Sequence, residues 1–176
     1  MNAAAVTPDC APLWMRIVFG RNPKRTLIRL VCLVASSFLI FGFILIPIRV
    51  SGFSMAPTYK DGQVNFINHL AYRWKKPARG DVVAVRIVDD KSVVLLKRIV
   101  GLPGERVRVD CGRVYINGRL LSEPYAHVKN GLSKDEVNLK RDEYFVVGDN
   151  RPISILGPVP RYFILGKSIT GRSIAT

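Results

Sequence analysis

Residues 81–109 read DVVAVRIVDDKSVVLLKRIVGLPGERVRV, and this stretch decides the fold. Short runs rich in β-branched residues, at 81–88, 92–100 and 106–109, are separated by residues that form turns. Such runs predict strands, and the Leu-Pro-Gly segment at 102–104 predicts a reversal of chain direction. No part of the stretch has the length and period of a soluble helix.

The same pattern continues on both sides of this stretch. Further strand-like runs occur at 63–68, 113–116, 144–147 and 163–170. Turn signals such as Asn117-Gly118 separate nearly all of them. Many short strands with frequent turns bury their faces by coiling into barrels or sandwiches, so we predict a compact, multi-stranded all-β domain. The polar stretch at 127–140 lacks strand alternation and is predicted to be a loop.

An uncharged apolar run, LVCLVASSFLIFGFILIPI, occupies residues 30–48. As a helix it would span roughly 28 Å, which matches the hydrocarbon core of a bilayer. Residues 1–29 contain five cations and one acid, so the positive-inside rule places them in the cytoplasm and places residues 50–176 on the exported face. A cleaved signal peptide is the alternative, but Arg49 interrupts the approach to any cleavage site. We therefore predict a single-pass, uncleaved signal-anchor in the cell membrane.

The composition limits the partners. The 176 residues carry a formal net charge of +14, which requires an anionic partner. The sequence has no cationic block, zinc-finger spacing or RNP-like motif, which argues against nucleic acid and favours an anionic membrane surface. Three scattered cysteines exclude a structural zinc site, and no metal or cofactor is predicted. Cys111 is expected to be a buried free thiol.

A candidate nucleophile lies just past the apolar run. Ser54 stands in SGFSMAPT at 51–58, between a glycine and a proline, where a rigid turn can expose a hydroxyl. A serine needs a base within hydrogen-bond reach, usually a histidine or a neutral lysine. His69 and His127 have no acid at a suitable spacing, which argues against a Ser-His-Asp triad and leaves both as expected surface residues.

Lys97 is a better candidate base, because it interrupts the apolar run at 92–100. An ammonium enclosed by valine and leucine side chains loses solvation, which lowers its pKa from about 10.4 toward neutrality. In the competing interpretation, strand alternation points Lys97 outward on a half-exposed strand beside the buried face. The residues alone leave both interpretations open.

Taken in order, four motifs resemble those of the type I signal peptidases, the membrane-bound Ser/Lys proteases. They are Ser54-Met55-Ala56-Pro57-Thr58, Arg79-Gly80-Asp81-Val82-Val83, the lysine motif from Leu96 to Glu105, and Gly148-Asp149-Asn150-Arg151. The resemblance runs from the apolar run to about Gly166 and implies the β fold of this family.

The resemblance also implies roles for individual residues. Ser54 would attack the scissile carbonyl, and a neutral, buried Lys97 would accept the hydroxyl proton. Ser154 matches the family serine that bonds the lysine ammonium. Asp149, Asn150 and Arg98 would be supporting residues, with Asp149 paired to Arg98 or Arg151. Met55 is expected to serve packing.

The implied substrate is an exported preprotein with small residues at positions −1 and −3, bound as an extended strand. The strand edges expected to receive it, and to help form the oxyanion hole, are contributed by Ser51, Gly52 and Phe53 and by Val93 to Leu95. Exposed apolar residues near Phe53 and a basic face would rest on lipid.

Two departures from the family pattern stand out. The Asp-Ser-Arg triplet that usually follows the position of Ser154 is replaced by Ile155-Leu156. Other residues would then have to hold the surroundings of Lys97 in place. Gly52 stands where some members place a second serine of the oxyanion hole. The backbone alone, or Ser51, would then serve.

Several alternatives remain. The closest is a dedicated maturation peptidase for a pilin or a secretion-system substrate, which the compact size and the lost triplet favour. A mitochondrial inner-membrane peptidase would share the chemistry. A non-catalytic, membrane-anchored binding module of the same fold belongs to a different class. The sequence leaves the oligomeric state open.

Overall fold

The structure is a computed structural model that describes residues 23–86 and 94–169. The chain divides into two units, one up to Ile40 and one from Phe41 onward. Helix α2 belongs to the first unit, and every described strand belongs to the second, which we call the β domain. The prediction of one N-terminal helix followed by an all-β domain is confirmed.

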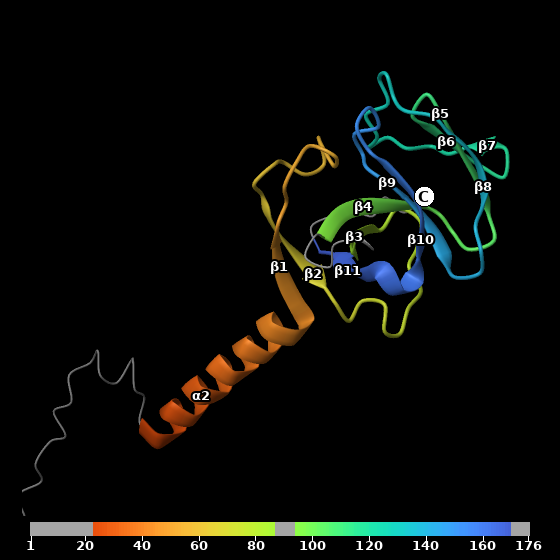
Figure 1. Cartoon of the computed structure of the whole chain (residues 1–176). Helices are drawn as coiled ribbons and strands as arrows, with labels where there is room; N and C mark the ends of the chain where they lie inside the picture. The colour runs from red at the N-terminus through yellow and green to blue at the C-terminus, as the bar shows by residue number, and fades with distance from the viewer. Residues whose placement is uncertain (1–22, 87–93, 170–176) are drawn as a thin grey trace, which may run out of the picture. The chain divides into compact units, whose positions relative to one another are not determined.

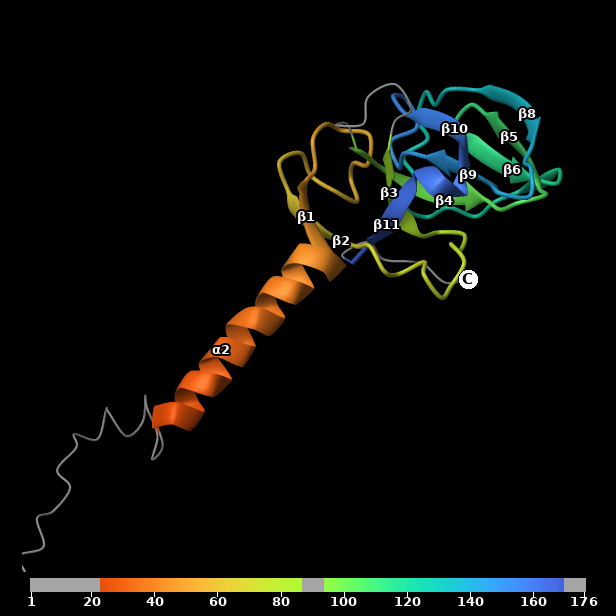
Figure 2. The same ribbon diagram turned by 60° about the horizontal axis from the view of Figure 1, so that its bottom comes forward.

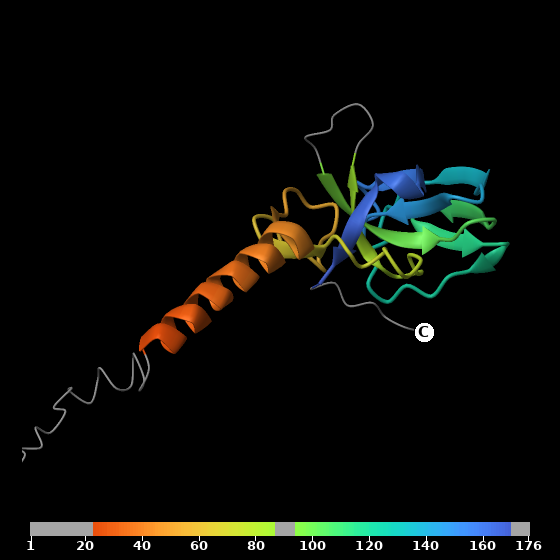
Figure 3. The ribbon, with the colours of Figure 1, turned by 90° about the horizontal axis from the view of Figure 1, so that it is seen from below.

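Helix α2 (Pro23–Leu39), drawn as an orange coil in Figure 3, continues into a π-helical turn, η1 (Ile40–Ile44). Residues Lys24–Ile44 are long and apolar enough to cross a membrane. The helix begins before the predicted run at 30–48, because proline suits a first helical turn and cations do not interrupt a helix. The end of that run, 45–48, instead lies in strand β1 (Leu45–Arg49), where pairing with the next strand satisfies the backbone.

The larger sheet is antiparallel and has seven strands in the order β1-β2-β11-β3-β4-β9-β10. After β1 its members are β2 (Val64–Asn68), β11 (Ile164–Ser168), β3 (Val82–Arg86), β4 (Val94–Gly101), β9 (Glu143–Val147) and β10 (Ile155–Pro160). A short 3-10 helix, η2 (Arg161–Phe163), links β10 to β11. All strands of the larger sheet except β1 and β10 fall on runs that the sequence predicted to be strands.

The smaller sheet has four strands in the order β7-β6-β5-β8. They are β7 (Arg119–Leu120), β6 (Arg113–Ile116), β5 (Arg106–Asp110) and β8 (Lys134–Asn138). Asn117 and Gly118 join β6 to β7 with φ values of 51° and 81°, as their turn chemistry predicts. Within the β domain, the smaller sheet lies at the end away from β1 and β2 (Figure 1 and Figure 2).

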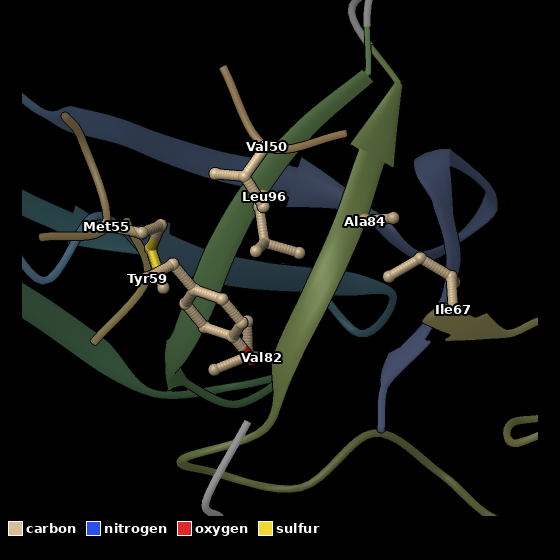
Figure 4. Close-up of a cluster of buried hydrophobic side chains, with 7 residues drawn as sticks. All are labelled: Val50, Met55, Tyr59, Ile67, Val82, Ala84 and Leu96. Atoms are coloured by element: carbon tan, nitrogen blue, oxygen red, sulfur yellow. The ribbon is translucent and has the colours of Figure 1, made fainter. Parts of the chain in front are cut away.

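Side-chain alternation places the strands between separate hydrophobic clusters. On β3, Val82 and Ala84 enter one cluster, whereas Val83 and Val85 enter another. The first cluster also contains Val50, just after β1, and side chains from β2 and β4 (Figure 4). Ile48 of β1 packs against the same cluster. Because the first and fifth strands of the sheet share this cluster, the sheet must curl. A third cluster joins β4 and β9 to the smaller sheet.

Two sequence-based expectations are wrong. The predicted loop at 127–140 contains β8, which pairs with β5. Its KDEVN sequence conceals the strand because β8 is an edge strand, so only one side of it is paired and most of its side chains are polar. Cys111 is a free thiol but is exposed. It lies in the turn between β5 and β6 with φ 46°, away from the core.

Gly101→Ala is expected to destabilise the β domain by about 1–3 kcal/mol, as overpacking does. A Cβ atom at Gly101 would lie 2.6 Å from Val107 Cγ2 and 2.7 Å from Phe145 Cβ, inside the third cluster. Denaturant unfolding followed by circular dichroism measures the change. Ser122→Ala, at an exposed position, is the control. Equal stability of the two variants would contradict this packing.

Candidate active site

Ser54 lies in the turn-rich segment between β1 and β2 and is half-buried. The residues that follow Ser54 hold this segment in place. Met55 and Tyr59 are 1% and 2% exposed and pack in the first hydrophobic cluster, so Met55 serves packing as predicted. Tyr59 N–H donates to the Met55 carbonyl at 3.0 Å, and the Tyr59 hydroxyl lies 2.7 Å from Ser168 Oγ on β11. These contacts hold the backbone of Ser54 in place.

Lys97 is buried in the middle of β4, with 4% of its surface exposed. Its neighbour Arg98 is also buried, so the interpretation that alternation exposes Lys97 to solvent is wrong. Burial disfavours the charged ammonium and lowers the pKa of Lys97 from 10.5 to about 8, while the charge of Asp149 acts in the opposite direction. Lys97 Nζ donates a hydrogen bond of 2.5 Å to Ser154 Oγ.

Gly148 is the point at which Ser54 and Ser154 approach each other. A side chain at Gly148 would collide with the Ser54 carbonyl oxygen and would lie 2.8 Å from Ser154 Oγ. Only glycine therefore allows both residues to pack against this position. The next residues complete the link, because Asn150 N–H donates to the Ser54 carbonyl at 3.1 Å. The candidate nucleophile and the hydrogen-bond partner of Lys97 thus share one support.

A buried ion pair connects the Lys97 strand to the same support. Arg98 donates two hydrogen bonds to Asp149, from Nε to Oδ1 at 2.8 Å and from Nη2 to Oδ2 at 2.7 Å. Asp149 therefore pairs with Arg98, one of the two partners considered. Thr58, in the Ser54 segment, donates its hydroxyl to the same carboxylate. The Asp149 carboxylate thus ties the segment that carries Ser54 to the strand that carries Lys97.

Arg151 forms a second brace that the sequence did not predict. Its side chain is fully buried and donates from Nε to the Gly148 carbonyl at 2.9 Å and from Nη1 to the Gly112 carbonyl at 2.6 Å. Its Nη2 pairs with Glu123. This brace fixes the carbonyl of Gly148 from the side of the smaller sheet. Arg151 belongs to the fourth motif, but its pairing with Glu123, 28 positions away, has no local signal in the sequence.

A cleft with a volume of about 240 Å³ opens beside Ser54. It is lined by residues 48–51, Ser54, Met55 and residues 94–96. Among the described residues, β1 pairs only with β2, and β9 joins β4 only from Arg98 onward. Each side of the cleft therefore offers a strand edge without a neighbouring strand.

The expected substrate-binding residues are only partly gathered at this cleft. Ser51 and Leu95 line it. Gly52 and Phe53 are not among its lining residues, and Phe53 is 64% exposed. The amide of Gly52 donates to Asp61 Oδ1 at 2.8 Å. Val93 lies outside the described residues. Within 23–86 and 94–169, no His, Cys, Asp and Glu residues are grouped to hold a metal ion.

The sequence of this chain is similar to those of several known signal peptidases. The profile described as "Signal peptidase, peptidase S26" matches residues 24–170. Signal peptidase I V of Bacillus subtilis is 33% identical over 141 residues, which cover 70% of this chain and 83% of that protein. A signal peptidase I of Bacillus amyloliquefaciens is 37% identical over 150 residues, 77% of each chain. A signal peptidase I of Enterococcus faecalis with a crystal structure is 31% identical, covering 53% of this chain and 97% of that one, with a TM-score of 0.45.

Asp149→Ala is expected to destabilise the β domain by about 3–5 kcal/mol, because it leaves the buried Arg98 guanidinium without its counter-charge. Asp110→Ala is the matched control, since Asp110 and Arg108 are both about half-exposed and lie 4.0 Å apart. Loss of that pair should change stability by less than about 1 kcal/mol. Denaturant unfolding compares the two, and a similar small loss in both would show that the buried pair has no structural role.

Proposed function

This chain belongs to the signal peptidase family, peptidase S26, whose members are serine endopeptidases, and we propose that it removes signal peptides from exported preproteins with a Ser54/Lys97 dyad. The single observation that carries the proposal is the state of Lys97. Its ammonium is buried, its pKa is lowered to about 8, and it bonds Ser154, which packs at the same glycine as Ser54. A lysine in this state is a usable general base near neutral pH.

In the proposed first step, neutral Lys97 accepts the hydroxyl proton of Ser54 while Ser54 Oγ forms a bond to the scissile carbonyl carbon. The resulting oxyanion is bound in part by the backbone amide of Ser54. Lys97 then gives its proton to the leaving amine as the peptide bond breaks, which leaves an acyl-enzyme. In the second step Lys97 takes a proton from water while the water oxygen forms a bond to the acyl carbon. The ester bond to Ser54 Oγ then breaks, Lys97 returns its proton to Ser54 Oγ, and the new carboxyl group leaves and loses its own proton to solvent.

Ser154 is proposed to orient Lys97 and not to react itself. Its oxygen accepts a hydrogen bond from Nζ, which limits the rotation of the flexible lysine side chain. Free rotation of the side chain would move Nζ away from Ser54 Oγ, the atom from which the proposed base accepts a proton. Arg98 and Asp149 hold the strand and the Ser54 segment together, and Asn150 holds the Ser54 carbonyl. These three residues act through the position of the dyad.

The cleft beside Ser54 supports an extended substrate strand. Its two sides, at residues 48–51 and 94–96, each have a free strand edge that can pair with a peptide backbone. Alternate side chains of that peptide would then face the cleft. Ile48 and Leu95 line the cleft, whose volume of about 240 Å³ favours small residues such as alanine at −1 and −3. A dedicated pilin or secretion-system substrate with such a site would fit the same cleft.

The proposal places the protein in the cell membrane. Residues Lys24–Ile44 are long and apolar enough for one span, and the excess of cations before them orients the N-terminus toward the cytoplasm. The β domain then faces the exported side, where Phe53, 64% exposed, is available to rest on lipid. Tethering enzyme and preprotein to one membrane raises their effective concentration.

Ser54→Ala is expected to abolish cleavage of a precursor with an Ala-x-Ala site by the detergent-solubilised full chain, because no other group supplies the nucleophile. Gel analysis and sequencing of the new N-terminus of the product measure it. Ser122→Ala, at an exposed position that does not line the cleft, is the control and should retain cleavage. Cleavage by Ser54→Ala at the wild-type rate would eliminate Ser54 as the nucleophile. Absence of cleavage by the wild type, tested also on pilin-like precursors, would favour a non-catalytic module.

The pH dependence of kcat/KM tests the base. Only neutral Lys97 accepts a proton, so activity should fall about tenfold per pH unit below its pKa and level off above about 8. Lys97→Ala should abolish turnover. Ser154→Ala removes an acceptor that stabilises the ammonium, so it should reduce the rate and move the profile to lower pH. A purely structural role for Ser154 would leave the position of the profile unchanged, and activity in Lys97→Ala would disprove the dyad.

A further inference from the structure

A second hollow in the β domain, with a volume of about 290 Å³, has no lining residue in common with the cleft beside Ser54. It is formed by the segment after β2, the β8–β9 connection and η2. Its charged lining residues are Lys75, Lys76, Arg141, Arg161 and Asp142. Four cations thus face one carboxylate around a hollow that plays no part in the proposed reaction.

The cations of this hollow are poorly neutralised by the protein itself. Lys75, Lys76 and Arg141 are exposed. Within the part of the chain that the structure describes, none of these three side chains makes a hydrogen bond or an ion pair. Bringing like charges together around a concave surface concentrates a positive potential there. An anion that entered the hollow would relieve this repulsion, and arginine and lysine are the residues that bind phosphate groups best.

The fourth cation, Arg161, is held rigidly at the hollow. Its Nη1 donates to the Ile164 carbonyl at 3.0 Å, and its Nη2 donates to the Tyr72 carbonyl at 3.3 Å. The Tyr72 ring lies 5.3 Å from the guanidinium carbon, and the Tyr72 hydroxyl donates to the buried carboxylate of Asp81 at 2.9 Å. One wall of the hollow is therefore formed before any ligand arrives, which reduces the entropy lost on binding.

The segment that lines the hollow starts where the apolar helix ends. Ile44 is the last residue of the candidate span, and its carbonyl accepts a hydrogen bond of 3.0 Å from His69 N–H. The residues after His69 lead to Trp74, which is 79% exposed and precedes the two lysines. Tyr162, 72% exposed, follows Arg161. Exposed tryptophan and tyrosine beside cations are typical of segments at the level of lipid head groups.

We propose that this hollow binds a phosphate group, and that the phosphate belongs to the head group of an anionic lipid. The choice of a lipid rests on the proposed membrane anchorage, whereas the phosphate site itself rests on the charges and the hollow alone. A bound head group would fix the β domain at the membrane surface through a contact separate from Ser54 and Lys97. The free phosphate ester of a soluble compound is the other source with the same chemistry.

Trp74 provides the readout for the test. The chain has two tryptophans, so Trp14→Phe in the full chain leaves Trp74 as the sole indole. One arm compares nanodiscs of phosphatidylcholine with nanodiscs that also contain phosphatidylglycerol. The other arm titrates the protein in zwitterionic detergent with glycerol 1-phosphate. The shift of Trp74 emission is measured in each arm.

The test compares two triple variants in this background. The hollow variant is Lys75→Gln, Lys76→Gln and Arg141→Gln, and the control variant is Arg113→Gln, Arg119→Gln and Lys129→Gln, which removes three exposed cations elsewhere. Each cation lost at an anionic surface should weaken binding roughly fivefold. A shift in anionic nanodiscs that the control retains and the hollow variant loses is the expected result.

Two further outcomes are informative. A saturable response to glycerol 1-phosphate in detergent, without a difference between the nanodiscs, would keep the phosphate site and overturn its assignment to lipid. Equal responses of the two triple variants, or no response in either arm, would overturn the site. The hollow variant should still cleave precursor in detergent, so failure of this inference is distinguished from failure of the proposed protease activity, which Ser54→Ala tests.

Discussion

The removal of the Lys97 ammonium from water is the constraint on which the proposed chemistry depends. Lys97 and Arg98 are adjacent on β4 and are both buried. Their side chains nevertheless have different hydrogen-bond partners. Arg98 meets both carboxylate oxygens of Asp149, whereas Lys97 meets a neutral hydroxyl. A buried cation with a counter-charge stays charged, and one without a direct counter-charge has a lowered pKa.

The ion pair between Arg98 and Asp149 also affects the protonation of Lys97. Asp149 raises the pKa of Lys97 through its negative charge, which opposes the effect of burial. Arg98 and Thr58 bond both oxygens of Asp149, and within the described residues no hydrogen bond or ion pair joins that carboxylate to Lys97. The same pair joins β4 to the segment of Ser54. One buried carboxylate therefore holds the segment of the candidate nucleophile Ser54 and leaves Lys97, the candidate base, without a direct counter-ion. A second brace, formed by Arg151 and Glu123, holds the Gly148 carbonyl.

The local sequence pattern predicted most of the strands, and the strands that it missed have a physical explanation. Apolar alternation identified the buried strands, because their side chains divide between two clusters. It missed β1, β7, β8 and β10, which are the edge strands of the two sheets and carry polar residues or proline. At the candidate site, the family resemblance pointed to Ser54, Lys97 and Ser154, whose catalytic roles stay predictions. The motifs could not identify the partners of Thr58 or Arg151, because those contacts join residues distant in the sequence.

The pKa of Lys97 itself is the most direct test of this account. It can be measured on the full chain in detergent micelles by following the ¹⁵N and ¹³Cε signals of labelled lysines against pH, with Lys97→Arg identifying the signal. We predict a titration near pH 8, well below that of the exposed lysines. A midpoint near the ordinary lysine value of 10.5 would leave a negligible fraction of neutral Lys97 near neutral pH, and would contradict its role as the base.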